Sequence, residues 1–80
     1  MKIGVKVIPK PEVLDSQGRA VEKTLAHHKI HVDQCIVGRY VVLDIPTESV
    51  EQAKVEAGKI AEFVLYNPLI ENFELEVLNS

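Results

Sequence analysis

The sequence predicts an α+β fold, in which one antiparallel sheet carries two helices on one of its faces. Three observations predict it. Short segments near both ends of the chain alternate apolar and polar residues, as half-buried strands do. Two segments further in repeat apolar residues every three or four positions, as helices do. A mostly β-branched stretch lies between them, so the predicted order is β-α-β-β-α-β.

The first strand is predicted over residues 2–8. Ile3, Val5 and Val7 alternate with Lys2 and Lys6, so one side of the strand faces the core. The chain does not begin with a charged stretch and a long apolar run, and no apolar run approaches the roughly 20 residues needed to cross a bilayer. We therefore expect an unprocessed cytoplasmic protein without a membrane segment.

A loop braced by Pro9 and Pro11 leads into the first helix, which is predicted over residues 17–29. The two prolines hold the approach extended. Asp15 is placed to cap the helix, because its carboxylate can accept hydrogen bonds from first-turn amides that have no partner within the helix.

Residues 32–45 are mostly β-branched or apolar, with an interruption at Gly38 and Arg39. They form either a hairpin around that pair or one long strand bent by a bulge, and we favour two strands. Alternate residues are expected to face the core, namely Val41, Leu43 and Ile45. The residues expected on the other face are Tyr40, Val42 and Asp44.

The second helix begins with a capping box made by Ser49 and Gln52 and stops before Asn67 and Pro68. Its apolar stripe is expected to comprise Val50, Ala53, Ala57, Ile60 and Val64. Gly58 lies in the middle of this helix, where glycine costs about 1 kcal/mol relative to alanine. We expect close packing against a neighbouring element to compensate for that cost.

The last strand is predicted where Phe73, Leu75 and Val77 alternate with polar residues. In a ferredoxin-like split βαβ arrangement the first and last strands are neighbours. Lys2 and Lys6 would then lie against Glu74 and Glu76, which are opposite in charge. The whole chain, residues 1–80, is expected to form a single domain.

Composition and motifs argue against several function classes. With 12 acidic and 9 basic side chains, the mean field repels nucleic acid. His27 and His31 share a helical spacing and Cys35 follows, but no paired-cysteine or HExxH pattern supports a metal site. Cys35 lies in a predicted strand, where packing is the better interpretation than catalysis. We expect no metal, no bound cofactor and no catalytic residue in this chain.

The second helix has more apolar residues than one sheet face can bury. Val55 and Tyr66 fall almost opposite the predicted stripe, and Phe63 lies on its flank. Leftover apolar surface on one helix of so small a domain is typical of a subunit contact. Phe63 and Tyr66 are therefore candidates for binding another chain.

Three blocks of the sequence resemble the PurS family in order and spacing: KPEVLDSQGRAVEKTL from Lys10, IVGRYVVLDI from Ile36, and LYNPLIENFELEV from Leu65. The chain departs from the family pattern at Ser16, where proline is usual, and at Tyr66, where alanine is usual. The resemblance implies a small, non-catalytic subunit of phosphoribosylformylglycinamidine synthase, which acts in purine biosynthesis. It further implies a dimer or dimer of dimers that joins a large synthetase subunit, using ATP and magnesium, to a glutaminase subunit.

By this resemblance the subunit would hold the two enzymes together and assist the transfer of ammonia from glutamine. The matching positions that are polar or conformationally special are the candidate contacts: Asp15, Gln17, Gly18, Arg39, Tyr40, Asn67 and Pro68. For each of them a cap, a turn or a helix stop is an equally good explanation. A different function class also stays open, because dimeric domains with this order of elements can sense amino acids between their subunits.

Overall fold

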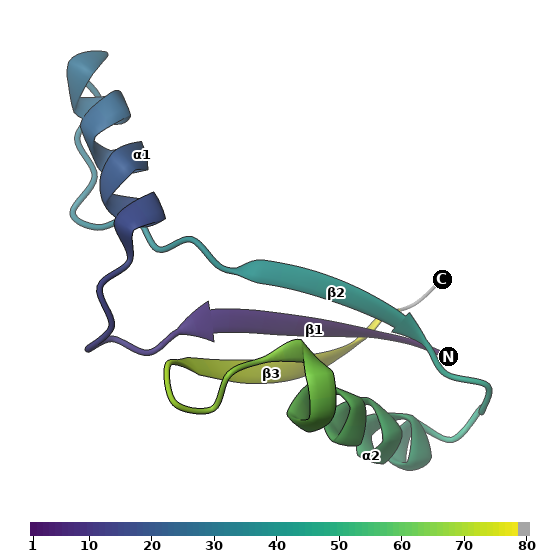
Figure 1. The fold of residues 1–80 in the computed structure, drawn as a ribbon. Coiled ribbons are helices and arrows are strands. Elements are labelled where there is room, and N and C mark those ends of the chain that lie inside the picture. Colours follow the sequence, from purple (N-terminus) through teal and green to yellow (C-terminus); the bar gives the residue numbers. More distant parts are fainter. Residues whose placement is uncertain (79–80) are drawn as a thin grey trace.

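The computed structural model describes residues 1–78, in which three strands and two helices alternate, and a π-helical turn, η1, continues the second helix (Figure 1). The elements are β1 (Lys2–Pro9), α1 (Ser16–His27), β2 (Arg39–Asp44), α2 (Val50–Ile60), η1 (Ala61–Leu65) and β3 (Glu71–Leu78). The sheet is antiparallel, with the strand order β2-β1-β3. The α+β class, the antiparallel sheet and the pairing of the first and last strands are confirmed.

The core lies between α2 and one face of the sheet. Ile3, Val5 and Val7 on β1 are fully buried, as predicted. The residues of α2 and η1 that are buried against the sheet are all alanines, namely Ala53, Ala57 and Ala61. Small side chains on the helix let it approach the sheet closely, so the large side chains of β1 fill the interface.

The apolar stripe predicted for the second helix is only partly correct. Val50 and Val64 are 44% and 62% exposed, and Ala61 takes the buried position expected of Val64. The wider π-helical turn of η1 changes the helical phase, because its hydrogen bonds span five residues instead of four. Leu65 and Tyr66 therefore pack against the core.

Tyr66 consequently does not lie on the outer face, and that part of the prediction is wrong. Its ring meets the ring of Phe73 edge to face, with 4.7 Å between the centroids. Phe63 and Val55 are exposed as predicted, at 87% and 55%.

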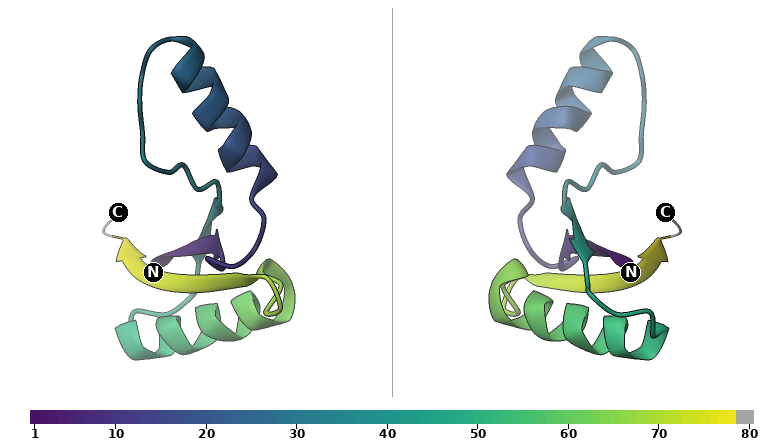
Figure 2. Two further views of the ribbon diagram at one scale, coloured as in Figure 1. Left: turned by 90° about the vertical axis from the view of Figure 1, so that its left-hand side faces the viewer. Right: turned by 90° about the vertical axis from the view of Figure 1, so that its right-hand side faces the viewer.

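Helix α1 does not lie on the sheet, so the prediction of two helices on one face is wrong for this helix. It projects beyond the strand ends together with the segment that returns to β2 (Figures 1 and 2). We call residues 10–38 the arm. The radius of gyration is 15.6 Å, whereas a compact chain of this length has about 12 Å. Only Gly18 is buried within α1, because the arm has no layer of its own chain to pack against.

The second strand predicted within residues 32–45 is also wrong, because the chain before Arg39 is irregular. Paired hydrogen bonds join Met1 and Ile45, at 2.7 and 2.8 Å, and they fix which residues of β1 bond to β2. Continuing the register would set Pro9 opposite Val37. Pro9 has no N–H to donate, so the ladder stops there.

Helix α1 ends two residues earlier than predicted. Lys29 has a positive φ of 63°, and the amide of Ile30 bonds back to the Leu25 carbonyl at 2.8 Å. This is a Schellman ending, in which a lysine takes the position that usually belongs to glycine. The ending reverses the chain direction, and the return segment then runs back along α1.

Gly58 does not have the close packing that we expected for it. A Cβ atom built there would meet only the Leu75 side chain, at 3.9 Å, which is an ordinary contact. The expectation that tight packing explains this glycine is therefore wrong.

The face of the sheet away from α2 is open to solvent. Tyr40 on β2 lies across Gly4, where no side chain obstructs it, and donates a hydrogen bond to Glu76 on β3. Lys6 lies opposite Glu74 in the register and forms an ion pair with Glu76 at 3.6 Å. The predicted charge complementarity between the two strands is confirmed for Lys6, whereas Lys2 lies opposite Leu78. None of the helices described is long and apolar enough to span a membrane.

Candidate interface at the base of the arm

Asp15 holds together the two ends of the arm. One oxygen of its carboxylate accepts a hydrogen bond from the Gly18 amide at 2.9 Å, which caps α1 as predicted. The other oxygen accepts from the Val37 amide, also at 2.9 Å. Hydrogen bonds from these two amides lower the pKa of Asp15 from its ordinary value. The Val37 amide, which lies just beyond the end of the β1–β2 ladder, is thus bound by the helix cap.

Glu22 makes a second such connection about two turns further along α1. Its carboxylate accepts from the Cys35 amide at 2.6 Å and from Arg19, also at 2.6 Å. The hydrogen bond from the Cys35 amide is the main reason that the pKa of Glu22 is lowered. Arg19 also donates to the Cys35 carbonyl at 2.9 Å. The side chains of Arg19 and Glu22 therefore bind both backbone groups of Cys35 in the return segment.

Gly18 is buried because the return segment passes directly over it. A Cβ atom at this position would lie 2.1 Å from the Cys35 carbonyl oxygen, a backbone atom. Glycine is therefore required here by close approach of two backbones.

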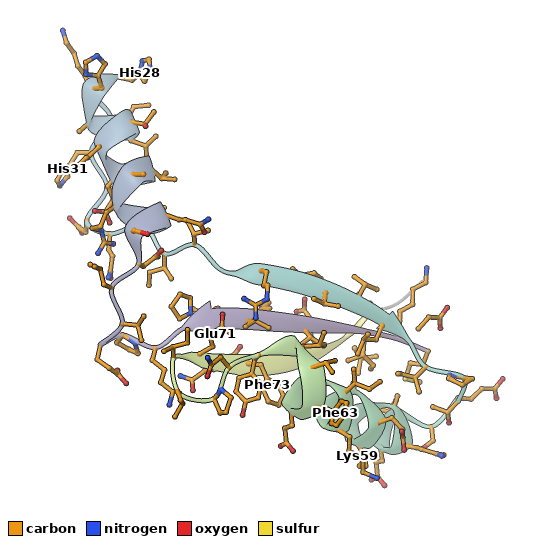
Figure 3. The ribbon with its side chains drawn as sticks, in the orientation of Figure 1. His28, His31, Lys59, Phe63, Glu71 and Phe73 are labelled. Atoms are coloured by element: carbon orange, nitrogen blue, oxygen red, sulfur yellow. The ribbon has the colours of Figure 1, made fainter. Side chains whose placement is uncertain are left out.

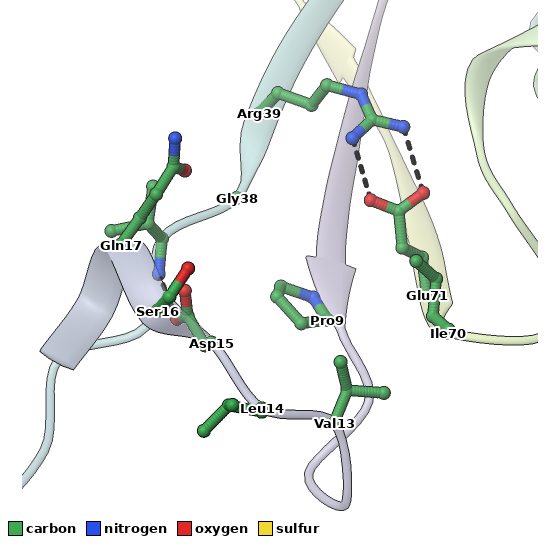
Figure 4. A pocket seen from close by; sticks show the side chains of 11 residues that line it. Pro9, Val13, Leu14, Asp15, Ser16, Gln17, Gly38, Arg39, Ile70 and Glu71 are labelled. Carbon is green, nitrogen blue, oxygen red and sulfur yellow. Dashed lines mark hydrogen bonds and ion pairs between the residues drawn. The ribbon is translucent and has the colours of Figure 1, made fainter.

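Arg39 and Glu71 join the first residues of β2 and β3 on the sheet side of the arm (Figure 4). The guanidinium binds both carboxylate oxygens, at 2.7 and 2.9 Å, and also donates to the Leu65 carbonyl at 2.6 Å. Glu71 in turn accepts from the Asn67 amide at 2.8 Å. These hydrogen bonds raise the pKa of Arg39 and lower the pKa of Glu71, so both groups stay charged at neutral pH.

A cleft of about 390 Å³ separates the base of the arm from the sheet (Figure 4). Asp15, Ser16 and Gln17 line one wall, and Arg39 and Glu71 line the other. Each charged side chain of these walls already has a partner within the chain. The cleft therefore offers a small charged ligand no unpaired charged side chain.

The predicted contact residues fall into three groups in the structure. Asp15, Gln17 and Arg39 line the cleft, and Gly18 is just behind it. Asn67 and Pro68 form the turn before β3, where the Asn67 side chain accepts from the Leu69 amide at 3.0 Å. Tyr40, Phe63 and Tyr66 lie elsewhere: on the open sheet face, on the outer side of η1 and in the core, respectively.

Sequence reasoning missed Glu71, Glu22 and Val37 at this site. Glu71 begins a strand in a block that matched the family, but no sequence pattern relates it to Arg39, which is 32 residues away. In the sequence Glu22 resembles the other charged residues of α1, which are expected to face solvent. Val37 was predicted within a strand, and its amide is available to Asp15 because the ladder to β1 ends at Arg39, which strand propensity does not show.

His28 and His31 lie on the outer part of the arm, away from the cleft (Figure 3), and His27 is the last residue of α1. His31 approaches the Asp33 carboxylate at 3.5 Å, and both side chains are almost fully exposed. Across residues 1–78, no three side chains of the metal-binding types gather in a way that could hold an ion. Cys35 is half-buried under α1, and only its backbone contacts Glu22 and Arg19.

Residues 2–79 match the family described as PurS, phosphoribosylformylglycinamidine (FGAM) synthase. The chain belongs to the PurS family. The resemblance found in the three sequence blocks is confirmed, and with it the assignment to a subunit of this synthase, a glutamine-dependent ligase of purine biosynthesis.

Relatives of known structure match both the sheet and the arm. A curated phosphoribosylformylglycinamidine synthase subunit PurS from Thermotoga maritima is 28% identical over 96% of this chain and 95% of its own length. The crystal structure of that PurS subunit superimposes with a TM-score of 0.90, covering 96% of this chain and 90% of its own. Bacillus subtilis PurS is 33% identical with a TM-score of 0.81, covering 98% of both chains.

A further match is a chain in the structure of PurLQS from Thermotoga maritima, with 28% identity and a TM-score of 0.88. It covers 96% of this chain and 95% of its own length. Because the similarity covers nearly the full length, the projecting arm belongs to the shared fold.

Replacing Gly18 with alanine is expected to destabilise the protein, although alanine is the better helix former. The new methyl group would displace the Cys35 carbonyl, and such overpacking costs about 1–3 kcal/mol. The matched control is Gly58→Ala, whose methyl group makes only an ordinary contact with Leu75 and which should stabilise by about 0.5–1 kcal/mol. Chemical denaturation of both variants measures the two changes. Equal stabilisation by both substitutions would contradict the close backbone approach.

Acidification is expected to release the return segment from α1. The folded-state pKa values of Asp15 and Glu22 are lowered from 3.8 and 4.5, so their contribution is complete above those values and is lost as the pH falls below them. The amide proton shifts of Val37 and Cys35 should titrate in this acid range. In Asp15→Asn the Val37 shift should no longer titrate, while that of Cys35 still does. Loss of both titrations, or of neither, would contradict the assignment of each amide to its own carboxylate.

Proposed function

We propose that this chain is a bridging subunit, which binds the large synthetase and the glutaminase subunits of FGAM synthase and performs no catalytic step itself. The large subunit uses ATP and magnesium, and the bridge holds the glutaminase close enough for ammonia to pass between them. Such proximity protects ammonia from protonation and diffusion in bulk water. The single thiol, Cys35, is compatible with a reducing cytoplasm.

The observation that carries this proposal is the arm. A chain of 80 residues buries only about 60% of its unfolded surface even when compact, and this chain leaves a helix and a long segment without a layer beneath them. The apolar side chains that remain exposed on the arm include Leu14, Val21, Ile30, Val32 and Ile36. Such a surface is stabilised by contact with other chains.

We infer that the first of these contacts is with a second copy, giving a dimer or a dimer of dimers. The arm and the open sheet face both expose large apolar side chains, which on the sheet face include Ile8 and Val42. Within one chain the arm does not reach that face, because the connections of Asp15 and Glu22 fix its direction. A second copy can supply the missing layer in both directions by symmetry.

Contacts to the two larger subunits are proposed for the remaining conformationally special positions. Asp15, Gln17, Gly18 and Arg39 present the cleft, and Asn67 and Pro68 present the turn beside it. Phe63, at 87% exposure, and Tyr40 extend this surface on η1 and on the sheet. Tyr66 contributes indirectly, by packing on Phe73 beneath η1. The amino-acid-sensing alternative lacks a free carboxylate and a free cation in the cleft, which an amino acid would need.

Reconstitution with purified partners tests the bridging role. Glutamine-dependent product formation by the synthetase and glutaminase should require this chain, whereas turnover supplied with ammonia should not. Gly18→Ala should weaken assembly, because it loosens the arm, and Gly58→Ala should leave it unchanged. Glutamine-dependent turnover that is the same with and without the chain would overturn the proposal. Heat released on titrating glycine or serine into the isolated chain would favour the sensing alternative.

A further inference from the structure

The outer edge of β3 has no neighbouring strand in the part of the chain that the structure describes. The Lys10 amide bonds to the Ile70 carbonyl at 2.8 Å, which fixes the alternation of the β1–β3 ladder. The residues of β3 whose backbone groups point outward are therefore Phe73, Leu75 and Val77. The register is continuous along all eight residues of β3, so this edge is regular and long enough to pair with another strand.

Edges of this length are usually protected by lysine, proline, a bulge or a covering element. Neither proline nor lysine occurs in β3, and α2 lies on its face and not along its edge (Figure 2). The charged side chains of β3 beside this edge are acidic, namely Glu74 and Glu76. Glu76 is engaged by Tyr40 and Lys6, whereas Glu74 is exposed and makes none of the ion pairs found within residues 1–78. The edge therefore presents free backbone groups next to uncompensated negative charge.

A second copy of this chain is a poor partner for that edge. Antiparallel pairing of two β3 strands about Leu75 would set Glu74 of one copy opposite Glu76 of the other, and like charges in that position are destabilising. Pairing with β2 of a second copy would bring Asp44 to the same face and no free cation, because Arg39 is bound to Glu71. The occupant must come from a different polypeptide.

We propose that the outer edge of β3 is a docking site for an extended segment of another protein, which adds a strand to the sheet and carries lysine or arginine at alternate positions. The segment bonds to the outward backbone groups of Phe73, Leu75 and Val77, and its basic side chains face Glu74 and Glu76. This inference rests on the proposed bridging function and names the chemistry of one of its contacts. Backbone pairing supplies affinity, and the charges select the partner.

Titration with two short capped peptides tests the site on the isolated chain. One peptide alternates lysine with threonine, and the other alternates glutamate with threonine. The lysine peptide should protect the amides of Phe73, Leu75 and Val77 from hydrogen exchange, and the glutamate peptide should not. Equal binding of both peptides, or protection of the outward amides of β2 at Tyr40 and Val42, would overturn the inference.

Two substitutions separate the backbone contribution from the charge contribution. Val77→Pro removes an outward N–H without breaking the ladder to β1, and it should abolish binding of the lysine peptide. Val42→Pro makes the same change at the outward edge of β2 and should have no effect. Glu74→Lys should weaken binding of the lysine peptide by about five-fold or more and strengthen binding of the glutamate peptide. If Val77→Pro does not fold, the deciding test is whether Glu74→Lys reverses the preference between the lysine and the glutamate peptide. An unchanged preference in that variant overturns the inference.

Assembly with the synthetase and glutaminase distinguishes this inference from the bridging proposal. In the complete complex the outward amides of β3 should be protected, and Val77→Pro should weaken assembly where Val42→Pro does not. If the complex forms normally with folded Val77→Pro, the docking site is wrong and the bridge stands. If the wild-type chain fails to assemble, the bridging proposal is wrong whatever the peptides do.

Discussion

Most of this structure depends on the carboxylate of Asp15, which bonds to both ends of the arm. The ladder between β1 and β2 ends before Val37, since Pro9 has no N–H to donate to the Val37 carbonyl. The Val37 amide is instead bound by Asp15, the residue that also caps α1. One proline and one carboxylate thus end the sheet, start the helix and set the direction in which the arm leaves. Glu22 and Arg19 add connections to Cys35 within the first two turns of α1, so the base of the arm is held at more than one point.

The consequence of a fixed arm is a chain that cannot cover its own surface. The sheet uses only α2 as a covering layer, and the alanines of that helix leave the large side chains of β1 to fill the core. The arm and the open sheet face are left with apolar groups that a compact fold would bury. We therefore propose that assembly with other chains supplies the covering layers that this chain lacks. The charged groups at the base of the arm are already paired, so the contact that we propose there depends on shape and backbone contacts.

The sequence was sufficient for the elements that depend on local patterns. The alternation in β1 and β3, the caps at Asp15 and Ser49 and the neighbouring positions of β1 and β3 were all predicted. The reciprocal half of the predicted capping box is wrong, because the Ser49 amide donates to Thr47 and not to Gln52. The errors have a common physical cause. They depend on tertiary contacts or on backbone details, and the periodicity of the sequence encodes neither. The π-helical turn altered the phase of Tyr66, and the ladder stop at Pro9 removed a predicted strand. The pattern on α1 was correctly helical, but amphipathicity alone does not say whether the covering layer belongs to the same chain.

The arm-to-sheet distance in solution tests the central claim most directly. Spin labels at Lys29, near the tip of the arm, and at Lys54 on α2 would report it, with the labelled chain diluted in unlabelled chain so that only distances within one molecule are measured. The account predicts one narrow, long distance, consistent with a molecule 47 Å in its longest dimension, and a broad distribution when Asp15 and Glu22 are both replaced by alanine. A short distance in the unmodified chain, with α1 folded onto its own sheet, would contradict it.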